Sequence, residues 1–273
     1  MRIDELLKNW TARLAAAGIE TPALEAELIY AEAAGLRRGA WLPDAAPSPE
    51  AAARGETWLA RREKREPLQY IFGCAAFREL ELEVTPDVLI PRPETELLVD
   101  HALKALPRGG RLLDAGTGSG CIALSAAYER PDARVTAVDA SPAALAVAKR
   151  NAAKYGLAVA WIESDLLSSV AGGFDVIAAN LPYVCEEEYA TLAPELRHEP
   201  KSALTAPDRG MALIRKLAAQ APAHLNAGGR IFFEVGEGQA SVLADELVRA
   251  GYDAVEILND YCGVRRFVAA RKA

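Results

Sequence analysis

The N-terminal part of the chain repeats apolar side chains at the spacing of an α-helix. Between Asp4 and Ala17 they recur every three or four residues, at Leu6, Leu7, Trp10 and Leu14. Thr21-Pro22 then offers an N-cap followed by proline at the first helical position, and Gly35 is placed to end that helix. Ser48-Pro49-Glu50 repeats the start signal for a third helix, which Pro67 stops. The pattern predicts a first domain made of helices only.

A run of charges, Arg61-Arg62-Glu63-Lys64-Arg65-Glu66, lies where the third helix is expected to end, near Arg65. Charged side chains at a helix end are most simply solvated, and we expect that here. The alternative is that this charged run forms a docking surface for a partner protein.

From Phe72 to Ile90 the pattern changes to short alternating apolar segments, which predict a β-hairpin or paired strands between two domains. Strand-like runs then alternate with helical ones, and these runs are Arg111–Asp114, Arg134–Asp139, Val159–Glu163, Phe174–Ala179 and Arg230–Val235. Such alternation predicts a parallel, doubly wound sheet. Ala254–Leu258 and Arg266–Ala270 follow with a short connection and predict a final antiparallel hairpin.

Composition narrows the class of protein. The 273 residues are enough for two domains, and 51% hydrophobic with 25% charged residues is an ordinary globular balance. The net charge of −7 makes a dominant phosphate-binding surface unexpected, although a local basic patch stays open. No apolar run approaches the length of a membrane span and no apolar signal core follows Met1, so we expect no membrane attachment.

The spacing of the four cysteines indicates the redox state of the compartment in which the protein is expected to work. Cys74, Cys121, Cys185 and Cys262 are scattered, and no two of them form a Cys-x-x-Cys pair. This spacing argues against a disulfide framework or a structural zinc site and fits a reducing cytosol. We therefore expect a cytoplasmic protein without a metal.

A glycine-rich segment follows the first strand of the predicted sheet. Leu112-Leu113-Asp114 leads into Gly116-Thr117-Gly118-Ser119-Gly120, whose glycines allow a tight turn and a close approach to a ligand. Alone this is a weak signal, because such turns also occur without a ligand. The next strand ends in Asp139, which can accept hydrogen bonds from both hydroxyls of a ribose. S-adenosylmethionine (SAM) and NAD suit this pair equally well.

Two further features favour SAM over NAD. His101, His198 and His224 stand in unrelated contexts, so no acid–base constellation for hydride transfer is evident. A third strand ends at Ser164-Asp165-Leu166, the position from which such folds contact an adenine. Asp165 would accept a hydrogen bond from the exocyclic amine, or it only caps the next helix, and the sequence leaves both open.

A turn suited to a planar nitrogen nucleophile follows a later strand, at Asn180-Leu181-Pro182-Tyr183. The Asn180 side-chain oxygen can accept one N–H of an amide, and the Leu181 backbone carbonyl can accept the other. Pro182 stiffens the turn, and Tyr183 supplies an aromatic wall. A plain Asn-Pro turn is the alternative. Together with the glycine-rich turn, the segment predicts a SAM-dependent N-methyltransferase.

The chain also resembles a known family over essentially its full length, the PrmC/HemK protein-(glutamine-N5) methyltransferases that modify peptide chain release factors. The most specific matches are Glu66-Pro67-Leu68-Gln69-Tyr70-Ile71-Phe72-Gly73, Phe77, and the segment from Val88 through Pro91-Arg92-Pro93-Glu94-Thr95-Glu96. Further matches are Leu113–Leu124, Ala137–Leu145, Glu199-Pro200 with Ala203-Leu204, Glu234-Val235-Gly236 with Gln239, and Asp260 with Gly263 and Arg266.

The resemblance implies a fold, a domain organisation and a reaction. The fold is an α/β class I SAM-dependent methyltransferase with a seven-stranded, doubly wound Rossmann-like sheet. The domains are a helical bundle at 1–71 for substrate docking, a β-hairpin linker at 72–90 and a catalytic domain at 91–273. The reaction methylates the side-chain nitrogen of the glutamine in the Gly-Gly-Gln motif of release factors and releases S-adenosylhomocysteine.

The resemblance also implies site residues. SAM contacts come from Gly116 to Gly120, Asp139, Asp165, Leu166 and Asn180. Asn180, Pro182 and Tyr183 are the implied catalytic residues, and together with Leu181 they recognise the glutamine. The segment that roofs the site adds further substrate-binding residues, namely Arg92, Glu94 and Thr95. Taken without the family, that segment is a proline-stiffened turn whose Thr95 could cap a helix.

The chain departs from the family pattern twice. Leu181 replaces the first proline of Asn-Pro-Pro-Tyr, where only the carbonyl is expected to matter. Leu166 stands where an aromatic residue often flanks the adenine.

Two alternatives from other classes stay open. Asn-Leu-Pro-Tyr is close to the turn of ribosomal RNA adenine dimethylases, so an adenine-N6 methyltransferase acting on RNA or DNA is the first; the net charge and the Pro-Arg-Pro-Glu-Thr-Glu segment argue against it. A nucleotide-binding interaction module without chemistry is the second, and it would leave Asn180–Tyr183 unexplained.

We expect a monomer that acts on release factors without contacting nucleic acid directly.

Overall fold

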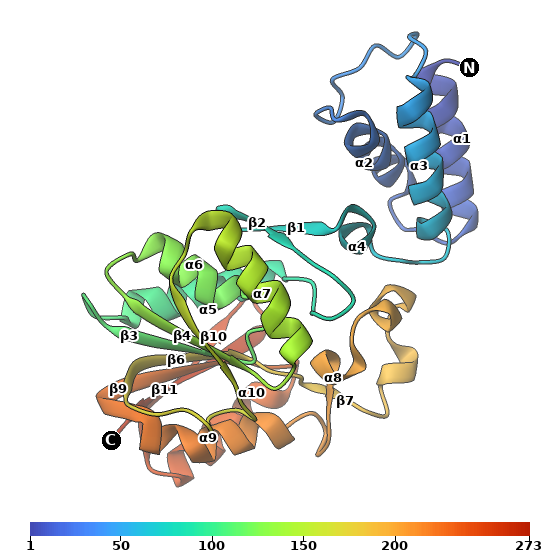
Figure 1. The fold of residues 1–273 in the computed structure, drawn as a ribbon. Helices are drawn as coiled ribbons and strands as arrows, with labels where there is room; N and C mark the ends of the chain where they lie inside the picture. Colours follow the sequence, from blue (N-terminus) through green and yellow to red (C-terminus); the bar gives the residue numbers. More distant parts are fainter. The chain divides into compact units, whose positions relative to one another are not determined.

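A computed structural model describes residues 1–273 (Figure 1). The chain divides into two compact units. The first, which we call the helical unit, comprises Met1–Gly73 and Ala193–His198, and the second, the sheet unit, comprises Cys74–Leu192 and Glu199–Ala273. The sequence analysis did not place Ala193–His198 with the N-terminal helices. No helix is both long and apolar enough to cross a bilayer.

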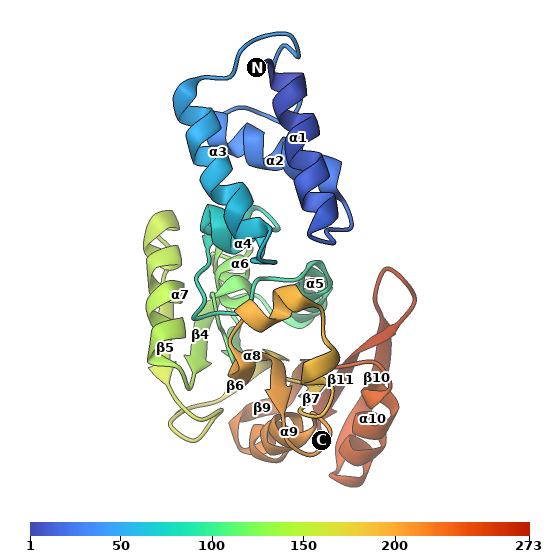
Figure 2. The same cartoon turned by 90° about the vertical axis from the view of Figure 1, so that its right-hand side faces the viewer.

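The helical unit contains α1 (Ile3–Ala16), α2 (Pro22–Ala34), α3 (Pro49–Arg62), α4 (Leu68–Phe72) and the 3-10 helix η2 (Pro194–His198). Figure 2 shows α1, α2 and α3 packed together. The predicted cap of α3 is formed, because the Ser48 hydroxyl accepts a hydrogen bond from the Ala51 N–H at 3.1 Å. Gly35 ends α2 with a left-handed φ of 66°. The three long helices were predicted; the five-residue α4 was too short to leave a periodic pattern.

The core of the helical unit is built around Trp10, which is fully buried with Leu14, Ile29 and Leu59. Helices α1 and α3 meet closely at Gly55. A Cβ atom at this glycine would lie 2.2 Å from the Trp10 ring, so the contact requires a residue without a side chain. The Trp10 indole N–H donates to the Glu56 carboxylate at 3.0 Å, which satisfies the one polar atom of the buried ring.

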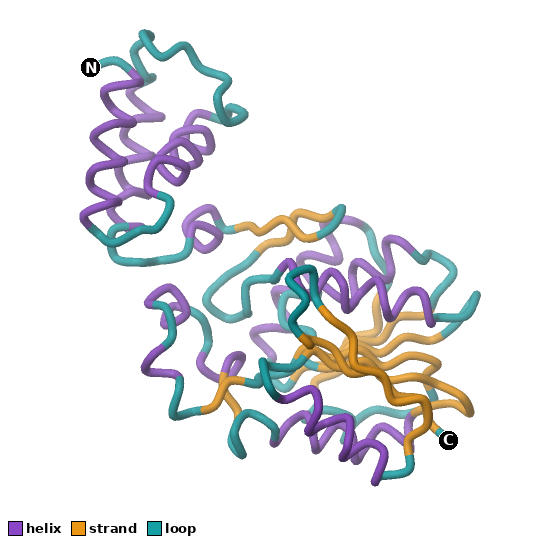
Figure 3. The backbone as a smooth tube through the Cα atoms, turned by 180° about the vertical axis from the view of Figure 1, so that it is seen from behind, coloured by secondary structure: helices purple, strands orange, loops and turns teal.

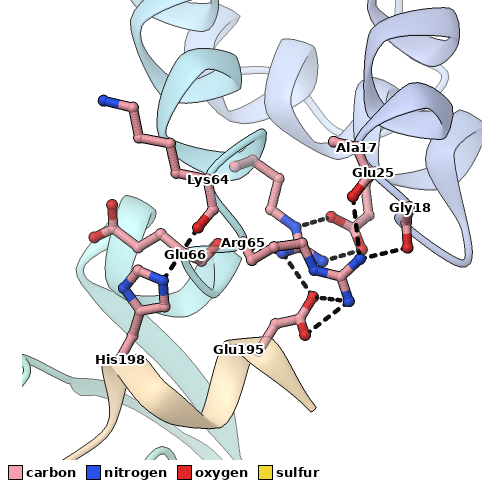
Figure 4. Close-up of polar contacts among 9 residues, drawn as sticks. Ala17, Gly18, Glu25, Lys64, Arg65, Glu66, Glu195 and His198 are labelled. Atoms are coloured by element: carbon pink, nitrogen blue, oxygen red, sulfur yellow. Dashed lines mark hydrogen bonds and ion pairs between the residues drawn. The ribbon is translucent and has the colours of Figure 1, made fainter.

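The charged run at the end of α3 is not simply solvated. Arg62 is only 6% exposed and forms ion pairs with Glu25 at 2.5 Å and with Glu195 at 3.0 Å. Arg65 pairs with the same Glu195 at 2.8 Å, and Figure 4 shows these two side chains facing each other. The prediction of a solvated helix end is therefore wrong for Arg62, because the segment that supplies Glu195 is remote in sequence and covers it.

The sheet unit begins with a two-stranded hairpin and continues with alternating strands and helices. Its elements before the turn region are β1 (Cys74–Phe77), β2 (Leu80–Glu83), α5 (Pro93–Ala105), β3 (Arg111–Ala115), α6 (Cys121–Glu129), β4 (Arg134–Asp139), α7 (Pro142–Tyr155), β5 (Val159–Glu163) and β6 (Phe174–Asn180). Those that follow are β7 (Val184–Cys185), the 3-10 helix η1 (Tyr189–Thr191), α8 (Lys201–Leu204), β8 (Thr205–Ala206), α9 (Ala212–His224), β9 (Leu225–Glu234), α10 (Gln239–Arg249), β10 (Tyr252–Asn259) and β11 (Arg265–Lys272).

Seven strands form one sheet in the order β10-β11-β9-β6-β3-β4-β5, drawn as the continuous fan of strands in Figure 3. All neighbouring pairs from β9 to β5 are parallel, and β11 is antiparallel to both β9 and β10. The predicted doubly wound sheet and its final antiparallel hairpin are confirmed. The register pairs Asn180 at the end of β6 with Glu234 at the end of β9.

A separate hydrophobic core covers each face of this sheet. Helices α5 and α6 and the hairpin β1–β2 pack on one face around Phe77, Leu112 and Phe267. Helices α9 and α10 pack on the other around Phe174 and Phe233. Because both faces are covered, only the strand ends are free to line a binding site, which is the usual arrangement in doubly wound folds.

Candidate active site

A cavity of about 320 Å³ lies at the carboxyl ends of β3, β4 and β6 in the sheet unit. This volume is within the range of about 300–1,000 Å³ typical of small-molecule sites. Most of the predicted site residues line it, namely Arg92, Thr95, Gly116, Thr117, Gly118, Ser119, Asp139, Asp165, Leu166, Asn180, Leu181 and Pro182. The predicted residues Glu94, Gly120 and Tyr183 do not.

The glycine-rich turn forms one wall of the cavity. The N–H groups of Gly116 and Thr117 both donate to the Val138 carbonyl at 2.9 Å, which fixes the turn between β3 and β4. Gly118 has a φ of 55° and no atom within 4 Å of where a Cβ would stand, so its backbone is open to a ligand. Gly120, with φ of 88°, instead packs against Leu124 at the start of α6. Its role is structural.

Asp114, which the sequence analysis did not select, lies fully buried beneath this turn. Its Oδ2 atom accepts hydrogen bonds from the Thr117 hydroxyl at 2.6 Å and from the Ala123 N–H at 3.1 Å, while Oδ1 has no partner. Burial raises the pKa of the carboxyl to about 7. The sequence signal for it was an acidic residue inside the apolar run Leu112-Leu113-Asp114-Ala115.

Asp139 projects from the end of β4 into the same cavity. Its two oxygens accept hydrogen bonds from the N–H groups of Gly118 and Ser141, each at 2.9 Å. Burial raises the pKa of this carboxyl above its usual value. Each carboxylate oxygen has a further lone pair, so the group can still accept hydrogen bonds from a ligand.

The turn after β5 lines the cavity with Ser164, Asp165 and Leu166. Asp165 caps no helix, since a turn rather than a helix follows it, so that alternative is wrong. Its carboxylate pairs with Lys216 and its side chain is 62% exposed. Leu166 is buried and lines the cavity.

Asn180 is held by a short chain of hydrogen bonds. Its Nδ2 atom donates to the Thr95 hydroxyl oxygen at 2.9 Å, and that hydroxyl is 2.7 Å from Oε2 of Glu234. Thr95 and Glu234 are each 1% exposed. Thr95 forms no helix cap: Arg92 is the N-cap residue of α5, and the Thr95 hydroxyl faces Asn180 instead.

The side chains that follow Asn180 lie in two different places: Leu181 packs on the glycine-rich turn, and Tyr183 lines a second cavity. The Leu181 side chain is buried, and a Cβ at Gly116 would lie 2.8 Å from its Cδ2 atom. Leu181 therefore packs on the glycine-rich turn in addition to offering its carbonyl. Tyr183 lines a neighbouring cavity with Arg266 and Gln239, and its backbone carbonyl accepts from the Gln239 side chain at 2.9 Å. Burial raises the pKa of the Tyr183 phenol to about 12.

The Pro-Arg-Pro segment above the cavity is anchored by Glu199, another residue that the sequence analysis did not place in the site. The buried Glu199 carboxylate accepts from the Ile90 N–H at 3.0 Å and pairs with the Arg92 guanidinium. Both partners lie just before α5, more than a hundred residues earlier in the chain. This contact fixes the segment from which Arg92 and Thr95 enter the cavity.

Comparisons with known proteins agree with this geometry. A family model described as the PrmC N-terminal domain matches residues 5–73, and one described as the methyltransferase small domain matches residues 93–207. A release factor glutamine methyltransferase of Deinococcus radiodurans is 41% identical, covering 100% of this chain and 99% of its own length. One of Cereibacter sphaeroides is 44% identical, covering 99% of both chains. The chain belongs to the release factor glutamine methyltransferase family.

Solved structures support the fold of this family member. A methyltransferase from Pyrococcus furiosus superposes with a TM-score of 0.57 at 25% identity, covering 72% of this chain and 91% of that one. A Thermus thermophilus 16S rRNA methyltransferase solved with AdoMet and guanosine has a TM-score of 0.55 at 20% identity, covering 73% of this chain and 50% of that one. The predicted class I methyltransferase fold is confirmed.

Proposed function

We propose that this protein transfers a methyl group from SAM to the side-chain nitrogen of the glutamine in the Gly-Gly-Gln motif of peptide chain release factors. The observation that carries the proposal is the state of Asn180. Its Nδ2 is engaged by Thr95 at 2.9 Å, so its Oδ1 is the atom left for a ligand in the cavity. This is the acceptor that a primary amide requires.

An amide nitrogen is a poor nucleophile because its lone pair is delocalised into the carbonyl. Asn180 Oδ1 accepts one of its two hydrogens and the Leu181 carbonyl accepts the other. Holding both hydrogens fixes the direction of the nitrogen and removes unproductive orientations. No general base is needed in this scheme, since the extra proton can leave after the methyl group has been transferred.

The cavity has the groups that SAM requires. Gly118 leaves its backbone open for close approach, Asp139 can accept from the ribose hydroxyls, and Leu166 offers an apolar surface to the adenine. Asp165 is the acceptor proposed for the adenine amine, although Lys216 competes for its carboxylate. When bound, SAM supplies an electrophilic methyl group on a positively charged sulfur. The protein's part is to bind it, to orient the amide and to keep the two aligned.

We further propose that the helical unit docks the release factor and that the enzyme works as a monomer in the cytoplasm. The relatives carry release factor in their names, and the family model that matches residues 5–73 is described as the PrmC N-terminal domain. The net charge of −7 argues against a nucleic acid as the main binding partner.

The proposal is tested by incubating the purified protein with labelled SAM and an intact release factor, an RNA, or neither. We expect label only with the release factor, and a mass increase of one methyl group on the peptide that contains Gly-Gly-Gln. A release factor whose motif glutamine is replaced by glutamate is the matched control and should stay unlabelled. Label on RNA adenines with none on the release factor would support the adenine-N6 alternative instead.

A further inference from the structure

Two buried side chains behind Asn180 have no role in the scheme above. Thr95 lies in the first turn of α5, and Glu234 ends β9 directly beside Asn180 in the sheet register. Both are removed from solvent; the Thr95 hydroxyl donates to the Glu234 carboxylate and accepts from Asn180. Burying a carboxyl group costs free energy, so its retention here calls for a function.

We propose that Thr95 and Glu234 are positioning residues that determine which face of the Asn180 amide is presented to the substrate. The inference rests on the proposed function, because it concerns how Asn180 is oriented toward a substrate amide. Neither residue needs to touch the substrate, since both act through Asn180.

The direction of the hydrogen bonds follows from the chemistry of each group. An ionised carboxylate has no hydrogen to give, so Glu234 must accept the single hydrogen of the Thr95 hydroxyl. The lone pairs of that hydroxyl then accept only from a donor, and the donor is Asn180 Nδ2. The Asn180 amide is thereby fixed with Oδ1 toward the cavity, as an acceptor for the substrate N–H.

Protonation of Glu234 removes this constraint. The carboxylic acid can donate to the Thr95 oxygen, which frees the Thr95 hydrogen to point toward Asn180. The asparagine amide then gains by turning its oxygen to Thr95 and its NH₂ to the cavity, and an NH₂ group cannot accept the substrate N–H. The ionised form of Glu234 is therefore the active one.

The surroundings of Glu234 place this change near neutral pH. Burial raises the pKa of its carboxyl to about 7, while Thr95 and the Arg266 and Arg92 guanidinium groups oppose the rise and Glu94 adds to it. The other titratable groups facing it are the Tyr183 phenol and the Cys121 thiol, and burial raises the pKa of each, so both stay neutral here. We expect the rate to fall as pH decreases through about 7.

Thr95 offers a matched pair of variants. Thr95→Val keeps the shape and removes the hydroxyl, and it should lower kcat by about 10–100-fold, the loss typical of partners that orient a ligating group. The apparent KM for SAM should change little. Thr95→Ser keeps the hydroxyl and should retain most of the activity. Equal kcat for Thr95→Val and the wild type would overturn the proposal.

Glu234→Gln provides the second test, because a glutamine keeps the shape but does not titrate. We expect this variant to retain part of the activity and to lose the fall in kcat on the acidic side of neutrality. If kcat of Glu234→Gln fell at acidic pH in the same way as kcat of the wild type, the titrating group would be another one, such as Asp114. That result would contradict the role of Glu234.

A readout independent of methylation separates this proposal from the proposed function. The Asn180 side-chain NH₂ resonances, identified by their absence in Asn180→Ala, can be followed by ¹⁵N NMR across neutral pH. They should shift with a midpoint near 7 in the wild type and stay constant in Thr95→Val and Glu234→Gln. A protein that shows this titration but methylates no release factor would contradict the proposed substrate and support the positioning role of Thr95 and Glu234. Methylation of release factor without this titration would support the substrate and contradict that role.

Discussion

Glu195 in the helical unit and Glu234 in the sheet unit are both carboxylates held inside a unit, but their partners differ. Burial alone would raise the pKa of Glu195, yet hydrogen bonds from Arg65 and Arg62 outweigh it and hold the pKa below its usual value. Glu234 has only the neutral Thr95 hydroxyl at hydrogen-bond distance, and its pKa rises to about 7. A paired carboxylate is fixed in one charge state, whereas an unpaired one can change its state under physiological conditions.

This difference between Glu195 and Glu234 distinguishes carboxylates that stabilise the fold from carboxylates that can take part in the reaction. In the helical unit the charges are compensated, and their removal should damage stability without altering a rate directly. In the sheet unit the compensation is left incomplete at Glu234 and at Asp114, next to the cavity. Strongly perturbed groups in a cleft are typical of functional sites, although structural networks also perturb them.

The largest effect is expected at Arg62. Replacing it with methionine leaves Glu25 without its arginine partner and leaves Glu195 with Arg65 alone, which should cost about 3–5 kcal/mol of the free energy of unfolding. Urea unfolding followed by tryptophan fluorescence suits this test, because Trp10, Trp41 and Trp58 all belong to the helical unit. Arg38→Met, which removes a long exposed pair with Glu27 at 3.8 Å, is the control and should cost less than about 1 kcal/mol. Similar losses for both variants would show that burial of the pair does not matter.

The next effect concerns turnover. Asn180→Ala should lower kcat by about 10²–10³-fold, the cost of losing one preorganised hydrogen bond in such a site, while the Kd for SAM changes little. Asn180→Asp keeps an acceptor oxygen and adds a charge that favours the cationic donor, so partial activity with equal or tighter SAM binding is expected. Single-turnover rates on intact release factor measure both. Asn259→Ala, at an exposed position on β10, is the control; near wild-type turnover in Asn180→Ala would remove this turn from the active site.

Glu234 should also leave a signature in stability. A carboxyl whose pKa is raised on folding binds its proton more tightly in the folded state, so the folded protein loses stability as pH rises from 4.5 through about 7. Glu234→Gln should remove this loss and gain up to about 3 kcal/mol over the wild type at about pH 8, with little gain at about pH 5. Glu195 contributes the opposite slope, since its lowered pKa gives stability that is lost as pH falls. A gain independent of pH would mean that Glu234 does not titrate in this range.

The smallest of the four effects is expected at Asp139. Asp139→Ala should weaken SAM binding by about 1–3 kcal/mol, the scale of lost charge-assisted hydrogen bonds. Part of this loss would come from the Gly118 N–H, which the carboxylate also holds at 2.9 Å. Calorimetric titration measures the affinity, and Asp132→Ala, two residues before β4 and outside the cavity, is the control. Unchanged affinity in Asp139→Ala would exclude it from the SAM site.

The local pattern of apolar and polar residues was sufficient to predict most of the helices and strands. Each of the seven predicted strands is present. The central strands β3 and β6 are buried on both faces and so are nearly continuously apolar, and the helices between the strands keep their own period. The glycine-rich turn, Asp139 and the Asn180 turn were also visible in the sequence, since each stands at a strand end. Parallel strands bring their carboxyl ends to the same edge, so these residues meet in one cavity.

What only the tertiary structure decided are contacts between residues far apart in the chain. Glu199 reaches Ile90, Glu195 reaches Arg62, and Glu234 reaches Thr95, each across a hundred residues or more. No local pattern distinguishes these glutamates from solvated ones, because their environment is made by distant elements that pack around them. The sequence by itself therefore determined the elements, the family and the residues at the strand ends. The folded chain decided which carboxylates are paired, which are buried alone, and so which one can control the orientation of Asn180.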